Sequence, residues 1–171
     1  VFIGSGVANL SCAIELSKLK KKIIILEAGS YNNEDQFDFF NGEVKGDGYD
    51  LNAVRYRGFM GTANKWFGWC KPIFDNVLET WGLKNLKLSK YNEKTLEFFN
   101  LKNDFKSNLS LNDYDNFEIK KCNTKQLLIR LKEEIKTNKN IDLILNCQVS
   151  KIELTKNNKY KIYFNNFKKK E

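Results

Sequence analysis

The first 29 residues contain an ordered series of patterns that restricts the fold more than any other feature of the chain. An apolar segment ends at Ile3, the glycine-rich turn GSGVAN follows, and residues 7–19 place apolar side chains on one face of a predicted helix. Residues 23–26 are apolar throughout, which is typical of a parallel strand covered by helices on both faces. This order predicts a β-strand, a helix and a second parallel strand, and therefore an α/β fold.

The glycine turn has the spacing of a dinucleotide-binding fingerprint. Gly4 is expected to make the tight turn, and Gly6 to let the backbone approach a pyrophosphate at the helix N-terminus. Glu27 follows Gly6 by 21 positions, at the end of the second predicted strand, where an acidic residue binds a ribose hydroxyl. A carboxylate favours a free 2′-hydroxyl over a 2′-phosphate. The pattern thus favours nucleotide binding over a purely structural turn, and it indicates FAD or NAD, not NADP.

Asn9 stands where the fingerprint has its third glycine, which normally lets the helix pack closely on the strand. A side chain at this position costs about 1 kcal/mol if the helix has to move away. The Asn9 amide could hydrogen-bond either a phosphate or the neighbouring backbone. A tolerated substitution and a cofactor contact are therefore both open at this position.

Residues 30–73 are predicted to form a long excursion over the surface of the first unit, because they contain most of the glycines and no clear period. The elements expected after residue 29 are helices at 75–81 and 89–99, a polar loop at 100–116, a helix beginning at Asn123 or Thr124, a buried strand at 141–146, and two hairpin strands on either side of residues 156–158.

Composition excludes several function classes. The net charge is +8, but 26 of the 29 basic residues are lysines, and these are dispersed except at 20–22 and 168–170. Nucleic-acid sites favour arginine, so we expect no nucleic-acid partner. The four cysteines have no CxxC spacing and the chain has no His, so we expect no metal site and a reducing, cytoplasmic location. An exported protein stays an alternative, because we expect the true N-terminus to be missing. No run of eighteen apolar residues occurs, so we expect no membrane span.

The segment RYRGFMGTANKWFGWCKPI, residues 55–73, resembles the glucose-methanol-choline (GMC) oxidoreductases, especially the branch with pyranose oxidases and sugar dehydrogenases. The opening GSG with EAG at 27–29, the helix DNVLETW and the segment NIDLILNCQVSKIEL are similar to further motifs of that family. The positions that match within the first segment are Arg57, Gly61, Thr62, Asn64, Trp66 and Gly68, followed by Pro72.

The resemblance implies a Rossmann-like, three-layer FAD-binding domain with a parallel sheet and an added β-hairpin. It implies one partial domain over residues 1–171, made of a βαβ unit (1–29), a flavin-wrapping insertion (30–122) and a closing helix, strand and hairpin (123–171). Because the sequence begins at Val1, close to the first glycine, we expect this domain to be incomplete at both ends and the substrate domain to be missing.

The resemblance also implies which residues contact the cofactor. Met60 replaces a glycine of the family motif, and Lys65 stands where some members carry a His that links covalently to FAD, so we expect noncovalent FAD. Lys65 either stabilises the reduced flavin or points to solvent. Trp66 and Trp69 either line the flavin or belong to the core. We expect Cys70 to be a packing residue and not a reactive thiol. The implied cofactor contacts are Gly4, Gly6, Asn9, Glu27, Ala28, Arg57, Gly61, Thr62, Asn64, Lys65, Trp66 and, at the adenine, the backbone of Val149.

The function implied by the resemblance is oxidation of a CH–OH group of an alcohol or sugar by hydride transfer to flavin N5. The family's catalytic base is a late His, and this chain has none, so we expect no catalytic residue here and no activity from this piece alone. The electron acceptor is open. Two alternatives are another FAD-dependent oxidoreductase or sugar mutase with the same opening, and a non-enzymatic basic domain or decayed copy.

Overall fold

The computed structural model forms two compact units, one of Val1–Lys65 with Leu128–Glu171 and one of Trp66–Leu127, and each is described by itself. The sequence predicts a single partial domain instead. The second unit is separate because it pairs its own short strands and buries its own leucines, Leu78 and Leu96. Pro72 and most of the polar loop at 100–116 lie outside the described residues. The structure describes residues 1–31, 43, 45, 46, 48, 51–71, 73, 75–83, 86–101, 110–111, 114–115 and 119–166.

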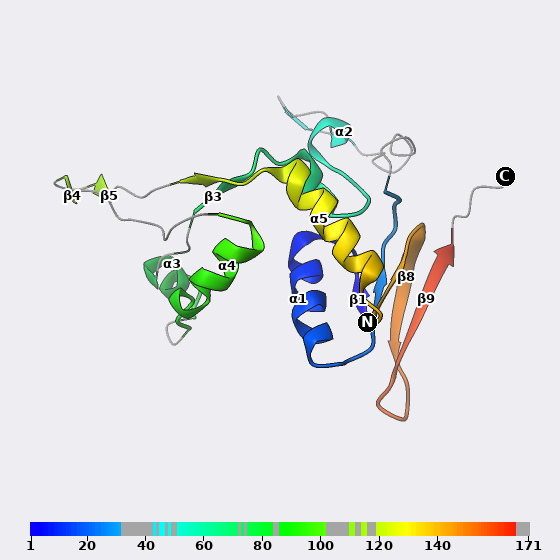
Figure 1. Ribbon diagram of the computed structural model, residues 1–171. Coiled ribbons are helices and arrows are strands. Elements are labelled where there is room, and N and C mark those ends of the chain that lie inside the picture. The colour runs from blue at the N-terminus through cyan, green and yellow to red at the C-terminus, as the bar shows by residue number, and fades with distance from the viewer. Residues whose placement is uncertain are drawn as a thin grey trace. The chain divides into compact units, whose positions relative to one another are not determined.

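A three-stranded parallel sheet forms the centre of the first unit, with the order β1-β2-β7. Strand β1 (Phe2–Ile3) pairs with β2 (Ile23–Leu26), and β2 pairs with β7 (Ile141–Ile144). Helix α1 (Val7–Lys18) connects β1 to β2, and α5 (Thr124–Thr137) precedes β7, as Figure 1 shows. The α/β fold and the parallel strands predicted from the first 29 residues are confirmed.

One face of this sheet is well covered and the other is partly open. Ile23 and Ile25 are almost fully buried on the covered face, opposite apolar residues of α1. Ile24 points to the other face and is 38% exposed, so the expectation that this strand is buried on both faces is wrong at its middle. The β8–β9 hairpin joins the chain just beyond the end of β2, where Cys147 N–H donates to the Glu27 carbonyl at 2.8 Å.

The hairpin consists of β8 (Cys147–Leu154) and β9 (Tyr160–Asn166), which pair antiparallel along their whole length, with an irregularity between Val149 and Lys151. Asn158 in the connecting turn has a φ of 54°, in the left-handed region that Asn tolerates better than most residues. The predicted hairpin around residues 156–158 is confirmed.

The second unit contains α3 (Asp75–Thr80), the short helix η3 (Ser89–Tyr91) and α4 (Asn92–Phe98), close to the two helices predicted there. Two small antiparallel ribbons complete it. Strand β3 (Trp69–Cys70) pairs with β6 (Lys120–Lys121), and β4 (Ser110–Leu111) pairs with β5 (Tyr114–Asp115).

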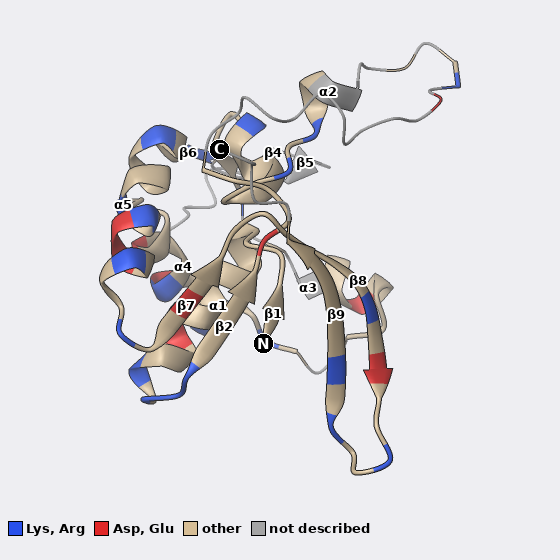
Figure 2. Ribbon diagram, turned by 90° about the vertical axis from the view of Figure 1, so that its right-hand side faces the viewer, with Lys and Arg blue, Asp and Glu red and all other residues tan. Residues whose placement is uncertain are grey.

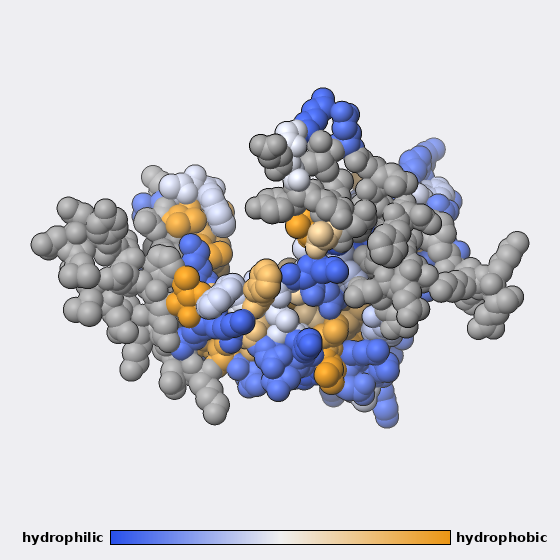
Figure 3. Space-filling view, turned by 90° about the horizontal axis from the view of Figure 1, so that it is seen from above, coloured by the Kyte–Doolittle hydropathy of each residue, from blue (hydrophilic) through white to orange (hydrophobic). Residues whose placement is uncertain are grey.

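Charged and apolar surface is mixed in the described residues. Figure 2 shows Lys and Arg (blue) on α5 and on the β8–β9 hairpin, with Asp and Glu (red) on the same elements. In Figure 3, apolar residues (orange) reach the surface at separate places between hydrophilic ones. Among the residues with a described placement, no helix is both long and apolar enough to cross a membrane.

Candidate cofactor-binding site

The glycine turn lies at the carboxyl end of the sheet, between β1 and α1. Gly4 has a φ of 83°, which only glycine adopts without strain, and its N–H donates to the carbonyl of Leu26 at 2.7 Å. A Cβ added to Gly4 or to Gly6 would meet no atom within 4 Å. Open space therefore lies over the turn, as close approach of a ligand to the backbone requires.

Helix α1 begins at this turn with its N-terminal amide groups uncapped by a side chain. Gly6 is the N-cap residue, it makes no side-chain capping bond, and the first turn of the helix contains no acidic residue. The first amide groups of a helix carry partial positive charge and lack partners within the helix. The start of α1 is thus suited to an anion such as a pyrophosphate.

Glu27 joins the glycine turn to the chain that follows β2. Its side chain is only 5% exposed. Oε2 accepts hydrogen bonds from Ser5 N–H and from the Ser5 hydroxyl, each at 2.7 Å, and Oε1 accepts one from Gly29 N–H at 2.9 Å. Because a carboxylate oxygen can accept about two hydrogen bonds, Oε1 keeps capacity for one further donor, such as a ribose hydroxyl.

Ser5 is a site residue that the sequence analysis missed. It is fully buried, and both of its donors are directed at Glu27. The only signal in the sequence is a small hydroxyl residue between two glycines, and that signal does not indicate a partner 22 positions away.

A second segment, residues 57–61, runs beside both turns. Phe59 N–H donates to the Ser30 carbonyl at 3.1 Å, and Met60 N–H donates to the Ser5 carbonyl at 3.0 Å. The contact at Gly29 is tighter still, because a Cβ there would lie 2.2 Å from the Arg57 carbonyl oxygen. The structure therefore brings together the GSG turn, the EAG turn and the RGFMG segment, which are far apart in the sequence.

Met60 preserves the backbone that a glycine would provide. Its φ is 68° and its side chain is 1% exposed. A non-glycine residue in this region costs on the order of 1 kcal/mol, which burial of the Met side chain offsets. Met60 therefore does not prevent the segment from reaching the turn, and a Cβ on Gly61 would lie 3.6 Å from the Cα of Gly6.

Asn9 uses its side-chain amide to hold the end of β1. Nδ2 donates to the carbonyls of Ile3 and Gly4, each at 2.9 Å. Both amide hydrogens are then engaged, and the remaining Oδ1 can only accept, so it has nothing to donate to a phosphate. The geometry favours the backbone alternative for Asn9.

Replacement of Asn9 by alanine is expected to lower the free energy of unfolding by about 1 kcal/mol, because two backbone carbonyls lose their donor. Urea denaturation measures this loss. Ser11→Ala, two residues further along α1, removes one exposed hydroxyl hydrogen bond; it is the matched control and should be within 0.5 kcal/mol of wild type. Unchanged stability of Asn9→Ala together with weaker FAD retention would instead indicate a cofactor contact.

The other implied contacts in the first unit lie around this centre. Ala28 and Arg57 are half-buried, and Thr62 and Lys65 are exposed, as the solvent alternative for Lys65 requires. Asn64 Nδ2 donates to the Phe59 carbonyl and closes the short helix η2 (Gly61–Lys65) onto the segment.

Val149 lies in β8, whose first residue is hydrogen-bonded to Glu27. Cys147 N–H donates to the Glu27 carbonyl at 2.8 Å, and Val149 follows two residues later, half-buried in β8. Its backbone therefore lies two residues along β8 from the hydrogen bond to Glu27, the predicted ribose site.

Trp66 belongs to the second unit, where its ring packs edge-on against Phe99 with centroids 5.8 Å apart. Trp69 is 57% exposed, with the Lys121 ammonium 5.3 Å from its ring centroid. Both tryptophans belong to the second unit and the glycine turn to the first, so their flavin contacts stay predictions.

Tyr56 is a second residue that sequence reasoning missed. Its side chain is buried. This burial raises the pKa of the phenol, and the negative charge of Glu27 raises it further. A Cβ added to Gly58 would lie 2.9 Å from the Tyr56 hydroxyl oxygen. The phenol therefore stays neutral beside the carboxylate, and it requires a glycine at position 58. A tyrosine between two arginines gives no sequence signal for this role.

Comparison with protein-family models, with curated proteins and with solved structures finds no match to this chain. Within the described ranges, no three His, Cys, Asp or Glu side chains gather as a metal site would require.

Proposed function

We propose that this chain binds FAD noncovalently through a Rossmann-like unit, and that it is the cofactor-binding part of an oxidoreductase acting on the CH–OH group of an alcohol or sugar. The observation that supports this proposal is the meeting of the glycine turn, Glu27 and residues 57–61 at the carboxyl end of a parallel sheet. In α/β proteins this end of the sheet is where nucleotides bind.

The residues at this end fit the adenosine diphosphate half of FAD. The open space over Gly4 and Gly6, with the start of α1, would accept the pyrophosphate. The free capacity of Glu27 Oε1 would accept a ribose hydroxyl, and the backbone of Val149 would face the adenine. When bound, FAD would supply the hydride acceptor, while this chain holds and orients it.

The chain's own contribution to the chemistry is binding. It contains no His, so the alcohol proton would go to a group other than a histidine of this sequence. All four cysteines are thiols, which supports a reducing compartment such as the cytoplasm as part of the proposal.

The packing of Gly58–Gly61 on the glycine turn favours this function over the two alternatives. That segment carries the resemblance to CH–OH oxidoreductases, and another FAD enzyme or a mutase would not require its sequence. The mixed charge on α5 and the hairpin gives no support to a basic nucleic-acid-binding module.

Replacement of Gly6 by alanine tests the proposal. Its φ of −60° suits alanine and no atom lies within 4 Å of the new methyl group, so stability should stay within about 0.5 kcal/mol of wild type. The methyl group would occupy the pyrophosphate position, so FAD affinity should fall about tenfold or more.

Reconstitution with FAD, removal of free flavin and the visible absorption spectrum measure this effect, with urea denaturation as the stability control. The proposal is contradicted if wild type retains no flavin, or if Gly6→Ala retains as much flavin as wild type.

A further inference from the structure

The second unit brings together two cysteines that are distant in the sequence. Cys70 lies in β3, and Cys122 directly follows β6. Since Cys70 pairs with Lys120 in this antiparallel ribbon, Cys122 lies opposite Gly68, two residues before Cys70. Side chains two residues apart on a strand share a face, so both sulfur atoms lie on the same face of the ribbon.

Gly68 permits this approach. Cys122 N–H donates to the Gly68 carbonyl at 2.8 Å, and a Cβ on Gly68 would lie 2.2 Å from the Cys122 carbonyl oxygen and 3.3 Å from its Sγ. Cys70 Sγ lies 3.5 Å from the same Gly68 carbonyl oxygen. Both thiols therefore lie against Gly68.

We infer that Cys70 and Cys122 are a dithiol that a hydroperoxide oxidises reversibly to a disulfide. Cys122 loses its proton, the thiolate attacks one oxygen of hydrogen peroxide, and the O–O bond breaks to give a sulfenic acid and a hydroxide. The hydroxide takes up the proton that Cys122 lost and leaves as water. The Cys70 sulfur then attacks the sulfenic sulfur, the S–O bond breaks, and a second water leaves. Two thiols and one hydrogen peroxide give one disulfide and two waters, and an added dithiol reverses the reaction.

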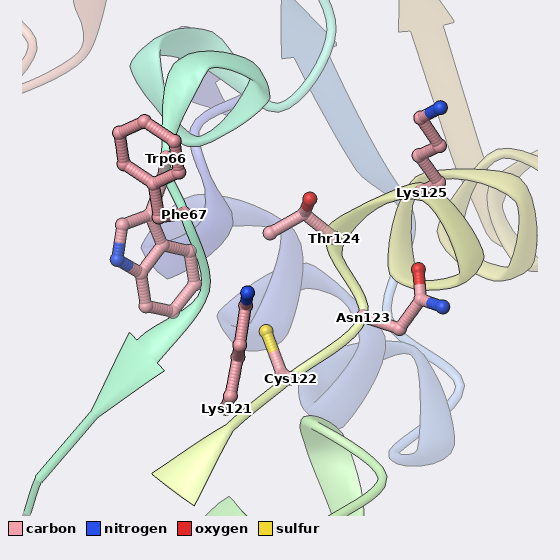
Figure 4. Close-up of a pocket in the computed structure, with 7 residues that line it drawn as sticks. All are labelled: Trp66, Phe67, Lys121, Cys122, Asn123, Thr124 and Lys125. Atoms are coloured by element: carbon pink, nitrogen blue, oxygen red, sulfur yellow. The ribbon is translucent and has the colours of Figure 1, made fainter. Parts of the chain in front are cut away.

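Both sulfur atoms are next to cavities that a small oxidant can enter. Cys122 lines one of about 440 Å³, and Figure 4 shows the side chains of Lys121 and Cys122 directed into the space beside Trp66 and Phe67. Cys70 lines a second cavity of about 420 Å³. The disulfide would join the two ends of the segment between β3 and β6.

The reaction should be slow at neutral pH and faster in alkali. Burial, followed by the neighbouring Cys122, raises the pKa of Cys70 to about 11, and burial also raises the pKa of Cys122. A raised thiol pKa means that little thiolate is present at pH 7 and that its fraction grows as the pH increases. Nearby charged side chains are Lys121 and Lys125, on the rim of the first cavity, and Lys71 on the second.

The test is peptide mapping of the full chain after treatment with hydrogen peroxide and alkylation of remaining thiols. Trypsin places Cys70 in peptide 66–84, because Lys71 precedes a proline, Cys122 in peptide 122–125, and Cys12 and Cys147 in two other peptides. We expect peptides 66–84 and 122–125 to be linked, with two of the four thiols lost, and the link to disappear on reduction. Unfolding temperature should rise by several degrees on oxidation.

Cys70→Ser and Cys122→Ser should each abolish the linked peptide, whereas the matched control Cys12→Ser, on an exposed site, should keep it. The inference is overturned if Cys70 and Cys122 stay alkylatable in the oxidised wild type, or if the products are only sulfinic acids or dimers through Cys12. Wild-type mapping alone gives this answer even if a serine variant fails to fold, and it does not depend on FAD binding.

Discussion

Replacement of Glu27 by alanine is expected to lower the free energy of unfolding by about 3–5 kcal/mol, one of the two largest effects in the chain. Three donors would lose their acceptor: Ser5 N–H, the Ser5 hydroxyl and Gly29 N–H. The first two belong to a fully buried residue that water cannot reach without local opening. Urea denaturation followed by circular dichroism measures the loss.

Two controls separate the role of this carboxylate from a general effect of losing charge. Ser5→Ala removes only one of the three bonds and should cost about 1–2 kcal/mol. Glu15→Ala removes an exposed carboxylate paired with Lys18 and should change stability by less than about 0.5 kcal/mol. If Glu27→Ala is as stable as Glu15→Ala, the carboxylate does not hold the two turns together.

Replacement of Gly29 by alanine is expected to cost about 3 kcal/mol or more and to weaken FAD retention. The added Cβ would lie 2.2 Å from the Arg57 carbonyl oxygen, 2.6 Å from its carbon and 2.7 Å from the Cα of Gly58. All three are backbone atoms, so the collision cannot be relieved by a change of side-chain rotamer. Residues 57–61 would have to move away from the turn, and the hydrogen bond from Phe59 N–H to the Ser30 carbonyl would be lost.

Gly6→Ala is the matched control, because its new methyl group meets no protein atom. The two alanine variants should therefore differ in stability: Gly29→Ala should be destabilised, whereas Gly6→Ala should be as stable as wild type and bind FAD more weakly. Equal unfolding midpoints in urea would show that the segment does not pack on the turn as described.

The parts of the fold that could be predicted are those encoded locally. The apolar run at residues 23–26 and the helical stripe of α1 predicted the βαβ unit, and the turn at residues 156–158 predicted the hairpin. The half-open face at Ile24 could not be predicted, because it depends on which element covers the sheet and not on the strand's own residues.

The site shows the same division. The spacing of Gly4, Gly6 and Glu27 indicated a common location, since glycine turn and acid both end up at the carboxyl end of adjacent strands. The contacts of Ser5 with Glu27, and of Met60 with the glycine turn, arise from long-range packing that no local pattern encodes. The side-chain bonds of Asn9 are local, but its two alternatives differ only in geometry.

The central claim is that the carboxyl end of the sheet binds the adenosine diphosphate half of FAD. An equilibrium titration of the full chain with FAD, followed by quenching of flavin fluorescence, tests it most directly when ADP and FMN are added as competitors. The account predicts saturable FAD binding that ADP displaces and FMN does not. Absence of saturable binding, or displacement by FMN and not by ADP, would contradict it.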